Sequence, residues 1–267
     1  MKIRGTTWLV TGASGGIGSA IAKALSDRGA CLVLVGRDAH KLEALKAQLP
    51  QSDSHRVLAV DLLAADGIDL LMQHLDGQPI DGLVNNAGCN QFGWFAKRTH
   101  NSLSDEITLN LLRPIELCHR LLSEKIQPCW IVNIGSTFGA IGYPGYASYC
   151  AAKAGLQRFS EALDRELSAK GIRVLHLAPR ATQTQLNPSV VEELNQKLGN
   201  HSDSPELVAE QFIDLLLHEQ RSRFIGWPEK LFARLNQLLP GVVGSAIRRQ
   251  YPLIAAALDK TNVEHPQ

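Results

Sequence analysis

The stretch "TGASGGIG", residues 11–18, decides the fold of this 267-residue chain. It follows the apolar run "TTWLV" (6–10) and opens a segment whose apolar residues recur with the spacing of one helix face, at Ile17, Ile21, Ala24 and Leu25. Glycines here allow a tight turn and let the backbone approach a pyrophosphate, which the helix N-terminus attracts. This order favours a phosphate cradle over a glycine-rich turn without a ligand. We expect the cradle to consist of Gly12, Ser14, Gly15, Gly16, Ile17 and Gly18.

The rest of the chain repeats this alternation of apolar runs and helix-period segments. Further short apolar runs lie at 31–36, 57–62, 80–88, 129–136, 172–179 and 221–226, and the longest helical segments are expected at 103–122 and 149–170. The runs are continuously apolar, which is typical of parallel strands buried on both faces. We therefore predict an α/β fold with a Rossmann-type doubly wound parallel sheet. It forms a single catalytic domain at 1–227, followed by a C-terminal helical extension at 228–267.

Composition and charge exclude several classes of protein. The chain is 45% hydrophobic and 20% charged with a net charge of +1, so nothing indicates a nucleic-acid partner. Its five cysteines are scattered without a C-x-x-C pair, which favours a reducing compartment and no metal site. No apolar run reaches the roughly 18 residues that a membrane-spanning helix needs. The apolar run near the N-terminus is too short for a signal peptide. We expect a cytoplasmic protein without a transmembrane segment.

A series of motifs in one order resembles the short-chain dehydrogenase/reductase family. The first is the spacing G-x-x-x-G-x-G at 12–18, and the second is "NNAG" at 85–88. The remaining positions are filled by Asn110 in "TLNLLRP", Ser136 in "NIGS", and Tyr149 with Lys153. The resemblance covers residues 5–226 and implies an NAD(P)-dependent oxidoreductase acting on CH–OH groups, commonly a homodimer or homotetramer. It also implies cofactor contacts from Asn86, Ala87 and Gly88.

The stretch "LVGRDAHK" at 34–41 selects between NADP and NAD. An acidic residue in place of Gly36 would bind the ribose 2′-hydroxyl of NAD, whereas Arg37 suits the 2′-phosphate of NADP. We predict NADP, with NAD less favoured and with Arg37 as a solvated surface charge as the alternative interpretation. Asp38 is expected to turn away and start the next helix, while Ser14 assists Arg37.

The run "GYPGYASYCAAK" at 142–153 gathers three of the four tyrosines in front of a lysine. Tyr149 and Lys153 are four residues apart on an expected helix and share one face, whereas Tyr143 and Tyr146 have no cation at that spacing. A neighbouring ammonium favours an ionised phenol, and lowering its pKa from about 10 toward 7 takes about 4 kcal/mol. We predict Tyr149 as the general acid/base and the other two tyrosines as pocket walls or packing.

The family resemblance implies the remaining roles. Lys153 holds the nicotinamide ribose, Ser136 hydrogen-bonds the substrate oxygen, and Asn110 holds a water in a proton relay. Standing alone, Ser136 would be a strand-ending serine and Asn110 a polar helix residue. Further cofactor contacts are implied at Asp61, Leu62, Pro179, Thr182 and Thr184. Asp61 can equally begin a turn, and Arg180, where the family has glycine, either binds an anionic substrate or turns into solvent.

Two regions surround the expected substrate site. Phe92, Trp94 and Phe95 indicate a partly apolar substrate, with simple core packing as the alternative. Residues 181–204 are polar, loop-like and only weakly helical, and they follow a strand end where ligands bind in such sheets.

The C-terminal extension carries an amphipathic pattern. One helical stripe is formed by Leu231, Phe232, Leu235, Leu238 and Leu239, with cations beside it. A helix pair that packs on the body, covers the substrate entrance or builds a dimer interface is favoured over a membrane-surface helix.

The predicted function is an NADP(H)-dependent oxidoreductase that interconverts a ketone or aldehyde and the corresponding alcohol. The alternative is a catalytically idle NADP-binding sensor or scaffold with the same fold. A nucleotide-sugar epimerase or dehydratase is disfavoured, because those longer family members carry a different glycine spacing and a larger C-terminal domain. The substrate itself and the physiological direction stay open.

Overall fold

The computed structural model describes residues 2–124, 126, 128–184, 186–227 and 229–264. Its centre is a seven-stranded parallel sheet of order β3-β2-β1-β4-β5-β6-β7. The strands are β1 (Thr7–Thr11), β2 (Cys31–Gly36), β3 (Arg56–Ala59), β4 (Gly82–Asn85), β5 (Trp130–Ile134), β6 (Arg173–Ala178) and β7 (Ser222–Phe224). The chain runs outward from β1 to β3 and then crosses back to β4. The carboxyl ends of β1 and β4 therefore flank the switch point where such sheets bind ligands. The predicted Rossmann-type fold is confirmed.

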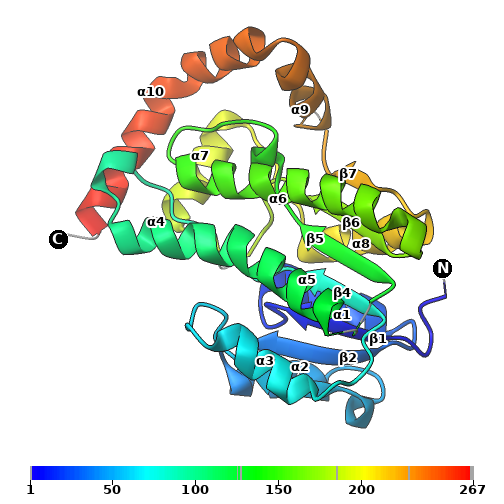
Figure 1. The fold of residues 1–267 in the computed structure, drawn as a ribbon. Helices are drawn as coiled ribbons and strands as arrows, with labels where there is room; N and C mark the ends of the chain where they lie inside the picture. The colour runs from blue at the N-terminus through cyan, green and yellow to red at the C-terminus, as the bar shows by residue number, and fades with distance from the viewer. Residues whose placement is uncertain (1, 125, 127, 185, 228, 265–267) are drawn as a thin grey trace.

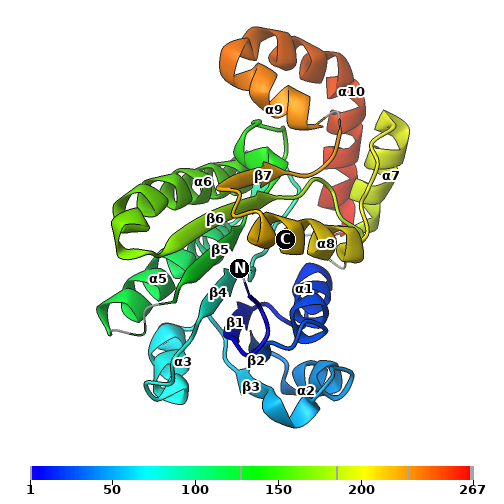
Figure 2. The same ribbon diagram turned by 90° about the vertical axis from the view of Figure 1, so that its right-hand side faces the viewer.

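Helices cover both faces of the sheet (Figures 1 and 2). They are α1 (Gly16–Ser26), α2 (Ala39–Ala47), α3 (Gly67–Leu75), α4 (His100–Ile107), α5 (Arg113–Ser123), α6 (Ala147–Leu167), α7 (Ser189–Leu198), α8 (Pro205–Leu217), α9 (Glu229–Leu238) and α10 (Pro240–Glu264). Figure 2 shows α1, α2 and α8 on one side of the sheet and α3, α5 and α6 on the other.

The alternation of side chains along β1 divides the core into two layers. Trp8 and Val10 are fully buried against α1 and α8, while Leu9 between them is buried against the α3 and α5 side. Both faces of the strand are therefore apolar, which is why the sequence shows continuous apolar runs.

Two segments differ from the sequence-based expectations. The stretch 181–204 contains the ten-residue helix α7, because Val190, Val191 and Leu194 have an apolar surface to bury against. The helical stretch at 103–122 is interrupted by a π-helical turn at Thr108–Leu112, between α4 and α5.

The C-terminal helices form an arch at the top of Figure 1. The far end of α10 packs beside α7, where Ile254 and Leu258 are fully buried. Trp94 Nε1 donates a hydrogen bond to Asp259 Oδ1 at 2.8 Å, and Lys260 Nζ lies 2.9 Å from Glu193 Oε2. The ends of the extension lie outside the described residues. Among the residues that the structure describes, no helix is both long and apolar enough to cross a bilayer.

Candidate active site

Ser136, Tyr149 and Lys153 meet just beyond the carboxyl end of β5. Ser136 hydrogen-bonds to the phenol of Tyr149. Lys153 Nζ lies 5.7 Å from the centroid of the Tyr149 ring and donates a hydrogen bond to the carbonyl of Ile134 at 2.9 Å. Tyr149 and Lys153 lie in the first turns of α6, where a separation of four residues places their side chains on one face. The three residues singled out from the sequence thus form one cluster.

Asn110 joins this cluster through the π-helical turn. Its Nδ2 donates to the carbonyls of Cys89 at 2.6 Å and Glu106 at 2.8 Å. Its Oδ1 is buried and has no hydrogen-bond partner among the described residues. A Cβ on Gly88 would lie 2.6 Å from that Oδ1 and 3.7 Å from Lys153 Nζ, so both atoms face the same glycine. A buried acceptor beside the lysine is the atom that a proton relay needs.

Burial determines the acidity of the tyrosine and the lysine. It raises the pKa of Tyr149 above its usual value, and the hydrogen bond from Ser136 only partly opposes this. Burial also lowers the pKa of Lys153 to about 8. The expectation that Lys153, together with the positive charge of a bound nicotinamide, lowers the pKa of Tyr149 toward 7 stays a prediction.

A buried ion pair supports the cluster and was missed in the sequence. Arg98 NH1 lies 3.0 Å from Glu106 Oε2, and these side chains are only 4% and 1% exposed. The hydroxyl of Ser148 donates to the same carboxylate, and the backbone N–H of Gln91 donates to Glu106 Oε1 at 2.9 Å. Through Glu106, the ion pair connects Gln91 in the loop after β4 with Ser148, the residue before Tyr149. Arg98 precedes α4 and Glu106 lies near its end, eight residues later, so helical spacing does not reveal the pair.

The glycine turn is closely packed on its neighbours. Gly12 has a φ of +62°, and a Cβ there would lie 2.8 Å from the Cα of Ala87. A Cβ on Gly18 would lie 2.2 Å from the carbonyl oxygen of Gly12. Asn86 Nδ2 donates to the carbonyls of Thr11 and Gly12 at 3.0 and 3.1 Å, which ties β4 to the turn.

The start of α1 suits an anion. Gly15 caps the helix, and its first turn has no acidic residue. The backbone N–H groups of the first turn of α1 can therefore bind a phosphate without repulsion from a carboxylate. Ile17 packs its side chain on the core, so only its backbone can contribute to the cradle.

The end of β2 presents Arg37 to solvent. A Cβ on Gly36 would lie 3.2 Å from Ser14 Oγ, which brings the serine to the same place. Asp38 Oδ1 accepts the backbone N–H of Lys41 at 3.1 Å and caps α2, so it turns away as expected. Asp61 Oδ1 accepts the N–H of Leu63 at 2.9 Å, so the exposed aspartate begins a turn, while Leu62 is buried in the core.

The segment after β6 contacts the glycine turn. A Cβ on Gly16 would lie 2.7 Å from Thr184 Cγ2, so Thr184 touches the cradle. The Thr182 hydroxyl is turned inward and donates to the carbonyl of Arg180 at 3.0 Å, while Pro179 accepts a bond from Thr137 N–H at 2.9 Å. Arg180 forms an ion pair with Asp203 at 2.7 Å. The interpretation that Arg180 turns into solvent is wrong, because the side chain pairs with an aspartate 23 residues away, whereas binding of an anionic substrate by Arg180 stays a prediction.

The substrate side of Tyr149 is lined by apolar side chains. Tyr146 is 4% exposed, with its ring centroid 5.1 Å from that of Phe92 and 6.1 Å from that of Tyr149. Tyr143 stacks on Phe138 with centroids 5.0 Å apart. The same cluster includes Phe92 and residues of α7 and α10. Phe95, by contrast, is 61% exposed.

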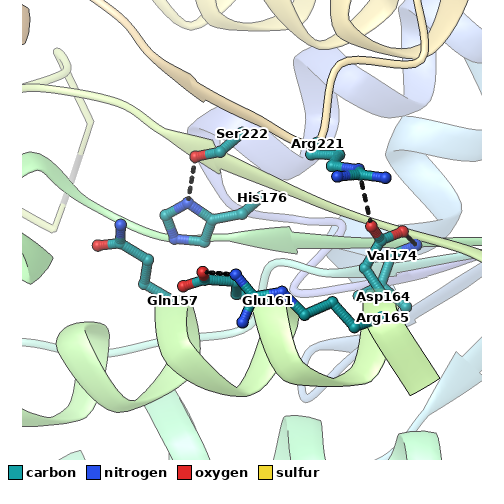
Figure 3. A pocket seen from close by; sticks show the side chains of 8 residues that line it. All are labelled: Gln157, Glu161, Asp164, Arg165, Val174, His176, Arg221 and Ser222. Carbon is teal, nitrogen blue, oxygen red and sulfur yellow. Dashed lines mark hydrogen bonds and ion pairs between the residues drawn. The ribbon is translucent and has the colours of Figure 1, made fainter.

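A separate cavity of about 260 Å³ lies behind α6, against β6 and β7 (Figure 3). His176 lines it, with Nδ1 3.4 Å from Ser222 Oγ, and burial lowers the pKa of this histidine to about 3. Arg221 Nε lies 3.2 Å from Asp164 Oδ2 on another wall. None of the residues that line the cavity belongs to the cluster around Tyr149.

The sheet and its glycine turn define a dinucleotide-binding α/β protein of the Rossmann type. The family model for short chain dehydrogenase matches residues 6–195. The chain belongs to this family of oxidoreductases, as its motifs predicted.

Individual relatives agree with this assignment. The 3-oxoacyl-(acyl-carrier-protein) reductase FabG of Haemophilus influenzae is 34% identical over 207 residues, which cover 76% of this chain and 84% of that protein. A short-chain dehydrogenase from Sphingobium yanoikuyae in complex with NADPH is 28% identical with a TM-score of 0.74, covering 90% of this chain and 95% of that one. The bulky-bulky ketone specific alcohol dehydrogenase from Comamonas testosteroni is 27% identical with a TM-score of 0.73, covering 90% and 94%.

Proposed function

We propose that this oxidoreductase uses NADP(H) to interconvert a ketone or aldehyde and the corresponding alcohol. The observation that carries the proposal is the joint position of Ser136, Tyr149 and Lys153 at the end of β5, with a buried acceptor of Asn110 beside them. A hydroxyl, a phenol and an ammonium in one partly desolvated cluster are the groups needed to bind and protonate a carbonyl oxygen.

Each side chain has one task in this proposal. Ser136 donates a hydrogen bond to the substrate oxygen and positions it against the phenol. Tyr149 gives its proton to that oxygen in reduction and takes it back in oxidation. Lys153, held by the carbonyl of Ile134 at 2.9 Å, brings a positive charge near the phenol and favours its ionised form. Asn110 Oδ1 accepts a hydrogen bond from the water that returns the proton to the lysine.

The residues present fit NADP. NADPH supplies the hydride when it is bound. Backbone N–H groups at the start of α1 would hold its pyrophosphate, and Gly12 and Gly18 are too closely packed for a side chain to intrude. Arg37 and Ser14 would bind the 2′-phosphate, since the Asp38 carboxylate is turned toward the start of α2 as a helix cap. The complex of the Sphingobium yanoikuyae relative with NADPH supports this cofactor.

The substrate is at least partly apolar. Phe92 and Tyr146 stand next to Tyr149, and α10 adds Ile254 and Leu258 to the same cluster. A site bordered by these side chains favours an aliphatic or aromatic ketone. The names of the ketone-specific and 3-oxoacyl relatives fit such a substrate.

The test is oxidation of NADPH and of NADH with a panel of aldehydes and ketones. Tyr149→Phe is expected to lose about 10²- to 10⁴-fold in rate while still binding NADPH. Tyr251→Phe, at the remaining tyrosine, is the matched control and keeps its rate. A phenylalanine variant that retains the wild-type rate would remove Tyr149 from the mechanism. Wild-type protein that binds NADPH but turns over no member of the panel would favour a sensor.

A further inference from the structure

Helix α9 packs on the body with the side opposite to its apolar stripe. Ala233 is only 1% exposed, and Asn236 Nδ2 donates to the carbonyl of Ala140 at 2.8 Å, so these two residues mark the face toward the body. Leu231 and Leu238 lie on the other side of the helix and are 46% and 79% exposed. A helix that only covered the body would bury its leucines and expose its asparagine.

The exposed apolar surface continues into the start of α10. Phe232, Leu239 and Val242 are 38%, 54% and 54% exposed. Together with Leu231 and Leu238 they form what we call the arch surface, which extends along α9 into the start of α10. These two helices form the arch at the top of Figure 1. Soluble monomers rarely leave several large aliphatic side chains exposed side by side without a partner.

The charges along the arch surface are mostly positive. Residues 229–258 contain four cations, Lys230, Arg234, Arg248 and Arg249, and a single acidic residue, Glu229, at the first position of α9. All four cations are exposed. An apolar stripe flanked by cations is typical of helices that lie in the interface of an anionic bilayer.

We propose that the arch surface docks on an anionic phospholipid membrane, with its leucines at the acyl boundary and its cations among the headgroups. The excess of positive charge argues against a second copy of the chain, because two such surfaces would bring eight cations together with only two acids, one Glu229 from each copy. The arch stands out from the sheet and its covering helices in Figure 1, which suits insertion into a lipid interface better than it suits the groove of a protein partner. The contact is peripheral, and it goes beyond the proposed reaction.

The docked surface stands next to the substrate side of the protein. Asn236 contacts the residue that follows the turn Thr137–Gly139, and this turn begins directly after Ser136. Membrane binding therefore places the site close to apolar molecules dissolved in the bilayer.

The experiment is co-sedimentation of the full chain with vesicles of phosphatidylcholine, alone or mixed with phosphatidylglycerol. We expect binding to the mixed vesicles, weaker binding to phosphatidylcholine alone, and release by salt.

The variants test which side chains make the contact. Leu231→Glu/Leu238→Glu should bind at least about tenfold more weakly than wild type. Leu70→Glu/Leu217→Glu is the matched control, because it adds the same two charges at leucines that are 36% and 47% exposed elsewhere. Arg248→Gln/Arg249→Gln should lose about tenfold on mixed vesicles only.

Three results would overturn the proposal. The first is no pelleting with mixed vesicles at low salt. The second is equal binding of wild type and the Leu231→Glu/Leu238→Glu variant. The third is a wild-type oligomer in sedimentation velocity that the same variant dissociates, without lipid binding, because the occupant would then be a second copy. Thermal unfolding of each variant shows that it is folded, so none of these results depends on catalytic activity.

Discussion

Arg180 and Asp203 form a bidentate ion pair that closes the segment between β6 and α8. Arg180 NH2 lies 2.7 Å from Asp203 Oδ1, and its Nε lies 3.0 Å from Oδ2. The side chains are only 15% and 5% exposed. Backbone bonds of 2.9 Å from Asp203 to Ala181 and from Gln183 to Asp203 close the same segment. The pair thereby holds Thr184 against the glycine turn.

Breaking this pair from one side should destabilise the protein. Asp203→Asn removes the negative charge of this nearly buried pair, at a cost of about 3 kcal/mol, and should also raise the KM for NADPH. The double variant Arg180→Met/Asp203→Asn should lose less than the sum of the losses in Arg180→Met and in Asp203→Asn. Denaturant unfolding of all four proteins measures the coupling. Strictly additive losses would mean that the pair has no energetic role.

Arg37 should distinguish the two nicotinamide cofactors. Arg37→Ala removes a charge-assisted contact with the 2′-phosphate that is worth about 1.5–3 kcal/mol, so the KM for NADPH should rise about 10- to 100-fold. The KM for NADH should hardly change, and Gly36→Asp should favour NADH further. Arg28→Ala, at another exposed arginine, is the control. An equal effect on both cofactors would contradict the assignment of the 2′-phosphate to Arg37.

Gly12 should tolerate alanine far less well than Gly77 does. Both glycines have positive φ values, +62° and +68°, so alanine is strained by about 1–2 kcal/mol at either position. Only at Gly12 does the new Cβ meet backbone, at 2.8 Å from the Cα of Ala87, whereas nothing lies within 4 Å at Gly77. Gly12→Ala should therefore lose more stability than Gly77→Ala and should also lose NADPH affinity. Equal losses in unfolding and in cofactor titration would contradict close packing at the cradle.

Lys153 should reduce stability at neutral pH while it serves catalysis. Burial lowers its pKa from 10.5 to about 8, so the unfolded chain binds more protons than the folded chain between these values. Stability from this group therefore rises as the pH increases through that window. Lys153→Met should be inactive, more stable than wild type at pH 7 by at most about 3 kcal/mol, and closer to wild type at high pH.

Thermal unfolding from neutral to alkaline pH measures this effect, with the exposed Lys170→Met as control. A variant that is less stable than wild type at neutral pH would show that the hydrogen bond to the Ile134 carbonyl outweighs desolvation.

Local patterns in the sequence predicted the elements that carry the site. The glycine turn, the four-residue spacing of Tyr149 and Lys153, and the capping role of Asp38 follow from short-range geometry. Such features depend on residues within one turn of each other, so they can be identified without knowing what packs nearby. The weak pattern of 189–198 was underestimated, because that helix gains its stability from a surface supplied by α10.

The amino-acid sequence by itself determined the order of strands and helices, the parallel sheet, and the face that Tyr149 shares with Lys153. Only the tertiary structure decided the partners of Arg98 and Arg180, the raised pKa of Tyr149, and the outward orientation of the stripe on α9. The physical reason is one of range. Periodicity and turn chemistry act between neighbours along the chain. Ion pairing, desolvation and the choice of which helix face is buried depend on surfaces that meet only when distant segments pack together.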